Sequence, residues 1–258
     1  MEAFWQPMNR SQLPHEALHQ YLSRYHGHEI RSDASMPDTP ALIVCNHGFG
    51  GVVDLNVFAL MHTFHRLDVT RPVTYLVHQL AWTLRAGRLI EAFGGRPASE
   101  EVARDALIAG HYVVVFPGGD VDAAKSWRHR HVVRFSGRSG FAKVAMAHNV
   151  PIVPVVTAGA GESLLVLSDG RRLARLLRLP RLARTKTLPM SLACPWGLNI
   201  GVAGVLPYAP LPTKLVTAVL PEMWPNDGEE PAAFASRVEY AMQERLDGLV
   251  ARRIPVIG

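Results

Sequence analysis

The sequence predicts an α/β fold: a single domain with a central, mostly parallel or mixed sheet flanked by helices, preceded by an N-terminal helical segment. Short continuous apolar runs at 41–45, 112–116 and 150–156 are typical of strands buried on both faces. Segments with helical periodicity alternate with these runs, as they do in α/β sheets with parallel pairs. The chain of 258 residues, 48% of them hydrophobic, is long enough to bury one core and too apolar for intrinsic disorder.

Single residues justify several element boundaries. Ser99 supplies a capping oxygen for a helix whose first turn carries two acids, and Gly110 ends that helix. Asn149 is expected to cap the end of the next helix. The other expected elements are a helical segment within 1–40, a helix at 55–64, a strand at 73–77, a helix at 139–148 and a last helix at 231–252, which carries an apolar stripe.

We expect one domain over 1–258, with 1–40 as the N-terminal helical segment, 41–225 as the α/β core and 231–253 as the C-terminal helix. Two cysteines cannot build a disulfide framework, which favours a reducing compartment. The first residues lack the basic and apolar regions of a secretion signal. The uncharged stretch 187–213 is interrupted by prolines and glycines, so we expect it to fill the core or line a lipid or substrate groove rather than span a membrane.

The strand at 41–45 leads directly into Asn46, His47, a glycine-rich loop and then Asp54. Ligands of open α/β sheets collect at the carboxyl ends of strands. A histidine there with a nearby carboxylate has the parts of an oriented general base, because the carboxylate fixes the imidazole tautomer. The alternative is a structural histidine near a turn, with Asp54 capping the helix that follows. The local sequence leaves both interpretations open.

Three further segments extend this pattern: 92–96 before a helix, 115–120 at the end of a strand, and the strand at 150–155. In order with 46–54, they resemble the four sequence blocks of the glycerolipid acyltransferase superfamily, the lysophospholipid acyltransferases. The resemblance runs from Pro40 to Val156 and more loosely to Pro210.

The resemblance implies a glycerolipid acyltransferase-like fold and acyl transfer from acyl-CoA or acyl-carrier protein, which serve as donor substrates, with no cofactor. His47 matches the catalytic base and Asp54 its carboxylate partner, while Arg96 matches a cationic contact to the acceptor. As a physical expectation, the amides of Gly118 and Gly119 are candidates to donate to the tetrahedral oxyanion. The implied substrate-binding residues are Asn46, Gly95, Arg96, Phe116, Pro117, Gly118 and Gly119.

Two departures from the family pattern bear on the substrate. Six residues separate His47 from Asp54 where the family has four, so the glycine-rich loop must double back for the two to pair. The third block reads Pro-Gly-Gly-Asp instead of Pro-Glu-Gly-Thr-Arg, which removes a phosphate-side contact. Both changes resemble the diacylglycerol acyltransferase-like branch, whose acceptors are often neutral alcohols.

The segment 171–186 carries seven basic residues and no acid. At helical spacing its first arginines share one side and its leucines the other, which is typical of an interfacial helix that binds anionic headgroups. The alternative is a surface helix whose leucines enter the core. We expect a cytoplasmic protein, peripheral on the inner membrane face, that binds membrane lipids and no nucleic acid. The expected membrane-binding residues are Arg171, Arg172, Arg175, Arg178, Arg181 and Arg184.

Other chemistries lack their residues. The histidine pairs at 62/65 and 129/131 have no third and fourth metal ligand near them, so no metal site is expected. The segment 137–141 ends in Phe where a nucleophile elbow needs Gly, and no phosphate-binding glycine motif is found. Two alternatives to acyl transfer remain: a thioesterase or lipase that uses the same site with water, and a non-catalytic lipid-binding protein in which His47 and Asp54 are structural.

Overall fold

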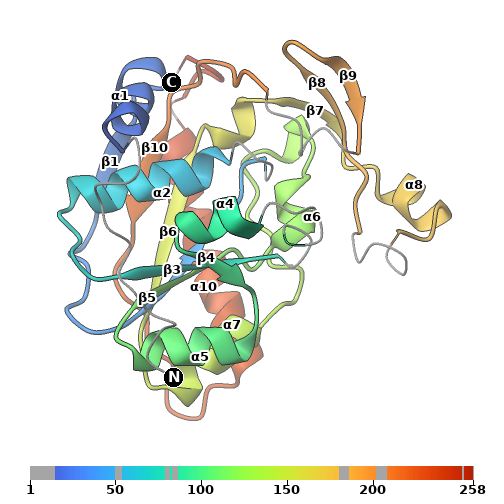
Figure 1. Ribbon diagram of the computed structural model, residues 1–258. Helices are drawn as coiled ribbons and strands as arrows, with labels where there is room; N and C mark the ends of the chain where they lie inside the picture. The colour runs from blue at the N-terminus through green and yellow to red at the C-terminus, as the bar shows by residue number, and fades with distance from the viewer. Residues whose placement is uncertain are drawn as a thin grey trace.

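The computed structural model describes residues 15–49, 54–78, 82, 87–179, 186–201, 208–251 and 253–257. Within these ranges the chain forms an α/β domain around a seven-stranded sheet of order β1-β10-β6-β2-β5-β3-β4, together with a three-stranded sheet of order β7-β8-β9 (Figure 1). The predicted fold class is confirmed.

The large sheet is mostly parallel. Strand β2 pairs in parallel with β5 and β6, and β3 pairs in parallel with β4 and β5, whereas β10 is antiparallel to β6 and parallel to β1. The carboxyl ends of β2, β5 and β6 therefore lie at one edge of the sheet. The strands are β1 Glu29–Ser32, β2 Leu42–Cys45, β3 Val73–Val77, β4 Gly95–Pro97, β5 Tyr112–Val115, β6 Ile152–Ala158, β7 Leu165–Ser168, β8 Met190–Ala193, β9 Gly197–Ile200 and β10 Val216–Val219.

Helices cover both faces of the large sheet (Figure 1). Helix α5 begins as the sequence predicts, because the Ser99 hydroxyl accepts a hydrogen bond from the amide of Val102 at 3.1 Å. The helices are α1 His15–Tyr25, α2 Leu55–Arg66, α4 Gly87–Ala92, α5 Glu100–Ile108, α6 Gly119–Ala123, α7 Gly140–Ala147, α8 Arg171–Leu176 and α10 Pro231–Val250, with short 3-10 turns η2 Trp127–His129 and η3 Ala160–Glu162.

Two apolar layers hold the sheet between its helices. On one face the strands pack against α5, α7 and α10, through side chains such as Ala106, Phe141 and Val238. On the other face Leu60 and Phe64 of α2 pack against the strands. This burial on both sides explains why the central strands read as continuous apolar runs.

The segment 1–40, expected to be helical before its closing loop, contains a strand after α1. Strand β1 lies in this segment and pairs with β10 at the edge of the sheet. Its sequence, Glu-Ile-Arg-Ser, is polar and partly exposed, so it lacks the apolar run that identifies the central strands.

The structure describes parts of the segments 171–186 and 187–213. Helix α8 ends at Leu176, and Arg178 has a left-handed φ of 55°. The leucines of α8 are exposed, so they do not enter the core. Part of 187–213 forms the β8–β9 hairpin, while Arg181, Arg184 and 202–207 lie outside the described residues. Among the helices that the structure describes, none combines the length and apolar character needed to cross a membrane.

A buried histidine pair connects α2 to strands β1 and β10 at one edge of the large sheet. The Nδ1 atoms of His28 and His62 lie 2.8 Å apart, and His28 Nε2 lies 2.8 Å from the Thr217 hydroxyl. One Nδ1 atom must donate and the other accept, so the pair needs an unprotonated ring. Burial lowers the pKa of His28 to about 3, with smaller contributions from His62, His26 and Arg66.

We predict that the protein loses stability as the pH falls below 6.5, with His28 as one cause. With a pKa of about 3 when folded and 6.5 when unfolded, His28 binds its proton more readily in the unfolded chain. The free energy of unfolding therefore falls by up to about 1.4 kcal/mol per pH unit between these values. In urea unfolding at a series of pH values, His28→Gln should show a shallower slope. His148→Gln, outside this pair, should keep the wild-type slope, and a wild-type slope for His28→Gln would contradict the assignment.

Candidate active site

His47 and Asp54 meet at the carboxyl end of β2. The His47 Nδ1 atom lies 3.1 Å from Asp54 Oδ2, and both side chains are mostly buried, with 15% and 11% of their surface exposed. A carboxylate only accepts hydrogen bonds, so Nδ1 carries the proton and Nε2 keeps its lone pair. Among the described residues nothing binds Nε2. The longer loop between the two residues therefore still allows them to pair.

Asp54 also begins α2. Its Oδ1 atom accepts hydrogen bonds from the amides of Asn56 at 3.0 Å and Val57 at 3.4 Å, as an N-cap side chain does. The two interpretations that the sequence left open, helix cap and histidine partner, are therefore both correct, because each carboxylate oxygen takes one role.

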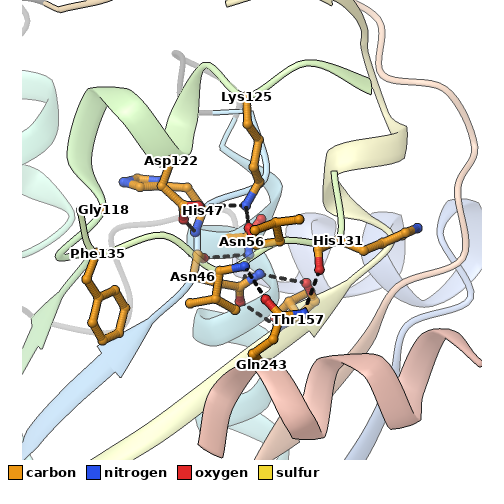
Figure 2. Close-up of polar contacts among 12 residues, drawn as sticks. Asn46, His47, Asn56, Gly118, Asp122, Lys125, His131, Phe135, Thr157 and Gln243 are labelled. Atoms are coloured by element: carbon orange, nitrogen blue, oxygen red, sulfur yellow. Dashed lines mark hydrogen bonds and ion pairs between the residues drawn. The ribbon is translucent and has the colours of Figure 1, made fainter. Parts of the chain in front are cut away.

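The peptide group between Asn46 and His47 is held at both of its polar atoms. The Asn46 carbonyl accepts from Asn56 Nδ2 at 2.7 Å, and the His47 amide donates to Asp122 Oδ2 at 2.8 Å. The other Asp122 oxygen accepts from Lys125 Nζ at 2.8 Å, and Lys125 also donates to the Val132 carbonyl (Figure 2). Helices α2 and α6 thus fix the backbone of His47 from two sides.

The Asn46 side chain is buried and extends the pairing of β2 with β6. Its Oδ1 accepts from the Thr157 amide at 2.9 Å, and its Nδ2 donates to the Thr157 carbonyl at 3.2 Å. Both polar atoms of the amide are therefore engaged by backbone (Figure 2). This arrangement gives Asn46 a positioning role at the base of the site.

The turn after β5 forms the next wall of the site. Phe116 stacks on the His47 ring, with centroids 4.5 Å apart and planes inclined by 27°. A Cβ atom on Gly118 would stand 2.2 Å from Asp122 Cβ, so only glycine permits this approach. The Gly119 amide donates to the Phe116 carbonyl at 3.1 Å, which removes it as an oxyanion donor. We expected this amide to donate to the oxyanion, whereas here Gly119, with a φ of +50°, closes a turn by donating its N–H to Phe116.

Arg138 holds this turn in place. Its guanidinium donates to the carbonyls of Pro117 and Gly118 and to Asp120 Oδ1 at 3.2 Å. Asp120 Oδ2 in turn accepts from the Lys186 amide at 2.6 Å. The third sequence block is therefore tied to the segment that leads into β8.

Arg96 and Gly95 lie away from the His47–Asp54 pair. They belong to β4, which is three strands from β2, or about 14 Å at the usual strand spacing. The register places Arg96 opposite Leu76 of β3, whose side chain packs with the core on the α5 side. The structure brings together His47, Asp54 and the turn at 116–119, and it leaves the pair on β4 at the edge of the sheet.

The described residues near the site offer neither a reactive thiol nor a metal-binding cluster. Cys45 precedes Asn46 and is buried, and burial raises the pKa of its thiol, so it stays protonated and non-nucleophilic. No group of three or more metal-ligating side chains is found in the described ranges.

Two cavities of about 430 and 470 Å³ are lined by Tyr112 and by Val150, next to the amino ends of β5 and β6. They lie at the edge of the sheet opposite His47.

Sequence reasoning missed three residues that position His47: Asn56, Asp122 and Lys125. The first lies two residues after Asp54, inside the helix expected at 55–64, where an asparagine gives no separate signal. The other two lie three residues apart and form a buried ion pair on and just after α6. Charged residues are rarely buried unless paired, but only the folded chain reveals the pairing.

The model of the family described as Acyltransferase matches residues 23–158, more than half of the chain. A Gallus gallus protein named "DGAT1/2-independent enzyme synthesizing storage lipids" is 30% identical over 159 residues, covering 60% of this chain and 47% of the relative. The Homo sapiens protein of the same name is 30% identical over 189 residues, covering 72% and 56%. An uncharacterized Mycobacterium leprae protein is 30% identical over 236 residues, covering 87% and 60%.

The chain spans about half the length of the curated relatives it matches. Among solved structures, the 1-acyl-sn-glycerophosphate (LPA) acyltransferase PlsC from Thermotoga maritima superposes with a TM-score of 0.50. The two sequences are 15% identical, and the match covers 92% of this chain and 81% of that chain, so the similarity concerns the fold. Because the family model spans more than half of the sequence, this protein belongs to the acyltransferase family, within the glycerolipid acyltransferase superfamily that its four sequence blocks resemble.

Proposed function

We propose that the protein transfers a fatty acyl group from an acyl thioester, acyl-CoA or acyl-carrier protein, to a hydroxyl group of a glycerolipid or another lipid alcohol. The observation that carries this proposal is the His47–Asp54 pair at the carboxyl end of β2, in which no described residue binds His47 Nε2. In this proposal the protein acts at the cytoplasmic face of a membrane, which is supported by its two free cysteines and by the cationic segment 171–186.

In the proposed reaction His47 Nε2 accepts the proton of the acceptor hydroxyl as its oxygen attacks the thioester carbonyl. Asp54 stabilises the imidazolium that forms. The tetrahedral intermediate then collapses, the carbon–sulfur bond breaks, and the imidazolium returns its proton to the departing thiolate. The products are an ester and a free thiol. Phe116 stacks on the ring and limits its rotation.

We propose a neutral alcohol as acceptor, such as a mono- or diacylglycerol. The third block lacks the glutamate and arginine that would contact a phosphate, and its Asp120 is engaged by Arg138 and Lys186. The names of the chicken and human relatives refer to storage lipids, which are neutral. The edge position of Arg96 on β4 gives it no contact with His47, and its role at the acceptor stays a prediction.

Replacing His47 tests the reaction directly. Purified protein is given radiolabelled palmitoyl-CoA with monoacylglycerol, diacylglycerol or lysophosphatidic acid, and the labelled esters are separated. We predict ester formation with the neutral acceptors and a loss of about 10²–10⁴-fold in rate for His47→Ala, the usual contribution of a general base. Equal product from His47→Ala would contradict the mechanism, and free fatty acid in place of ester would identify a hydrolase.

Substitutions of Asp54 separate its two roles. Asn caps helices about as well as Asp, so Asp54→Asn should keep the free energy of unfolding within about 0.5 kcal/mol of the wild type while kcat falls about 10²–10⁴-fold. Asp54→Ala should lose both kcat and stability, because it removes the partner of His47 and the helix cap; the missing cap should cost about 1 kcal/mol. Circular dichroism melts and steady-state kinetics measure the two effects. Wild-type kcat in Asp54→Asn would reduce Asp54 to a helix cap.

Two double variants test Asp122 as a positioning residue. Removing Asp122 alone leaves Lys125 buried without its partner, at a cost of about 3–5 kcal/mol, so both charges must be removed together. Asp122→Asn with Lys125→Met keeps an acceptor for the His47 amide, whereas Asp122→Leu with Lys125→Met has none. Relative to the asparagine variant, we predict for the leucine variant a kcat about 10²-fold lower, with unchanged KM for the thioester, and a loss of about 1–3 kcal/mol of stability from the unpaired amide. Equal kcat values would rule out the positioning role.

A further inference from the structure

The small sheet exposes apolar side chains on one face. Directly paired residues point to the same side: Leu192 stands opposite Leu165 and Leu198, and Met190 stands opposite Ile200. About half of the surface of Leu192, Leu198 and Ile200 is exposed to solvent, whereas Leu165 is partly buried. The exposed apolar residues of the sheet, which we call the apolar sheet face, are Leu167 (53%), Leu192 (50%), Leu198 (59%) and Ile200 (52%).

The opposite face of the small sheet packs against the loop that carries His47. Val166 and Ala193, which alternate with the exposed residues, are buried in one cluster with Phe49 and Tyr208. Phe49 is two residues from His47. The sheet is therefore attached to the active-site loop by one face and presents the other outward.

Cations gather beside the apolar sheet face. Helix α8 follows β7 and projects from the same side of the large sheet (Figure 1). Leu176 and Leu177 of this segment are exposed, as are Arg172, Arg175 and Arg178. These three arginines have no carboxylate partner among the described residues, whereas Arg171 pairs with Asp169 at 2.6 Å. Asp169 is the single acid in the sequence from 165 to 200, against seven basic residues.

We infer that the apolar sheet face and α8 together dock on a lipid bilayer that carries anionic headgroups. Contiguous exposed apolar surface is uncommon on soluble proteins and marks a contact site. A nucleic acid would satisfy the arginines but leave the leucines in water. A bilayer surface satisfies both, because apolar side chains enter the acyl boundary while cations remain among the headgroups. Trp196, half exposed in the turn between β8 and β9, has the side chain favoured at that depth.

Docking in this orientation brings the catalytic loop to the lipid. A packed sheet is one layer about 10 Å thick, so Phe49 on its inner face lies about that distance from the bilayer surface. A lipid acceptor then reaches His47 without leaving the membrane for bulk water. This consequence rests on the proposed function, whereas the docking itself does not.

Sedimentation with vesicles tests the inference. The full chain is mixed, without substrates, with vesicles of phosphatidylcholine alone or with phosphatidylglycerol added, and bound protein is measured at low and high salt. We expect tighter binding to the anionic vesicles and weakening by salt. Arg172→Gln/Arg175→Gln/Arg178→Gln should weaken binding to anionic vesicles about 100-fold. Leu192→Ser/Leu198→Ser should weaken binding about tenfold or more to both kinds of vesicle.

Matched control variants remove arginine and apolar side chains from exposed positions outside the docking surface. Arg24→Gln/Arg66→Gln/Arg104→Gln deletes the same charge from other exposed positions, and Ile108→Ser removes an apolar side chain that is 73% exposed. Both should bind like the wild type. Equal binding by wild type and both docking variants would overturn the proposal, as would a wild-type dimer that the Leu192→Ser/Leu198→Ser variant converts to a monomer.

The two proposals fail in distinguishable ways. All variants should melt at the wild-type temperature, because the altered side chains are exposed. With a short-chain, water-soluble monoacylglycerol as acceptor, the docking variants should keep wild-type activity. If no acceptor is acylated but vesicle binding follows the expected pattern, the acyl-transfer proposal fails and docking stands. If acylation proceeds but the docking variants still sediment like wild type, docking fails alone.

Discussion

The peptide group that joins Asn46 to His47 is the constraint on which the site depends. A strand that runs out of its sheet leaves its next carbonyl and amide without ladder partners. Here the carbonyl is bound by Asn56 of α2 and the amide by Asp122 of α6, so two helices fix one peptide plane. The direction of the His47 side chain follows from that plane. The ring then needs only Asp54 and Phe116 to settle its rotation and tautomer.

Two carboxylates of this site, Asp54 and Asp122, each make two separate contacts, one with each oxygen. Asp54 begins α2 with one oxygen and orients His47 with the other, so the position of the helix and that of the imidazole are linked. Asp122 similarly binds a backbone amide with one oxygen and Lys125 with the other. Burying this ion pair is tolerable because Lys125 also donates to a carbonyl, which leaves few unsatisfied groups. Shared contacts of this kind make a site rigid, since no member can move alone.

The two faces of the small sheet have different surroundings, because successive side chains of a β-strand point to opposite faces. One hairpin therefore presents Ala193 to the protein and Leu192 to the outside. The inner side chains contact Phe49 and are thereby coupled to the loop after β2. The outer side chains form an apolar surface bordered by arginines. The small sheet therefore connects an exposed apolar surface on one face with the loop after β2 on the other.

The sequence by itself determined the α/β class and the central strands, and it identified His47 and Asp54 as candidate partners. Continuous apolar runs identify strands buried on both faces, and His47 and Asp54 flank a strand end and a helix start that are visible locally. Strand β1 was not predictable because an edge strand of polar residues carries no such run. The tertiary structure alone decided the contacts across the chain: Asp122 lies 75 residues from His47, and Thr157 lies 111 residues from Asn46. It also decided that the leucines of α8 face outward, because a helical period shows which residues share a side but not what that side meets.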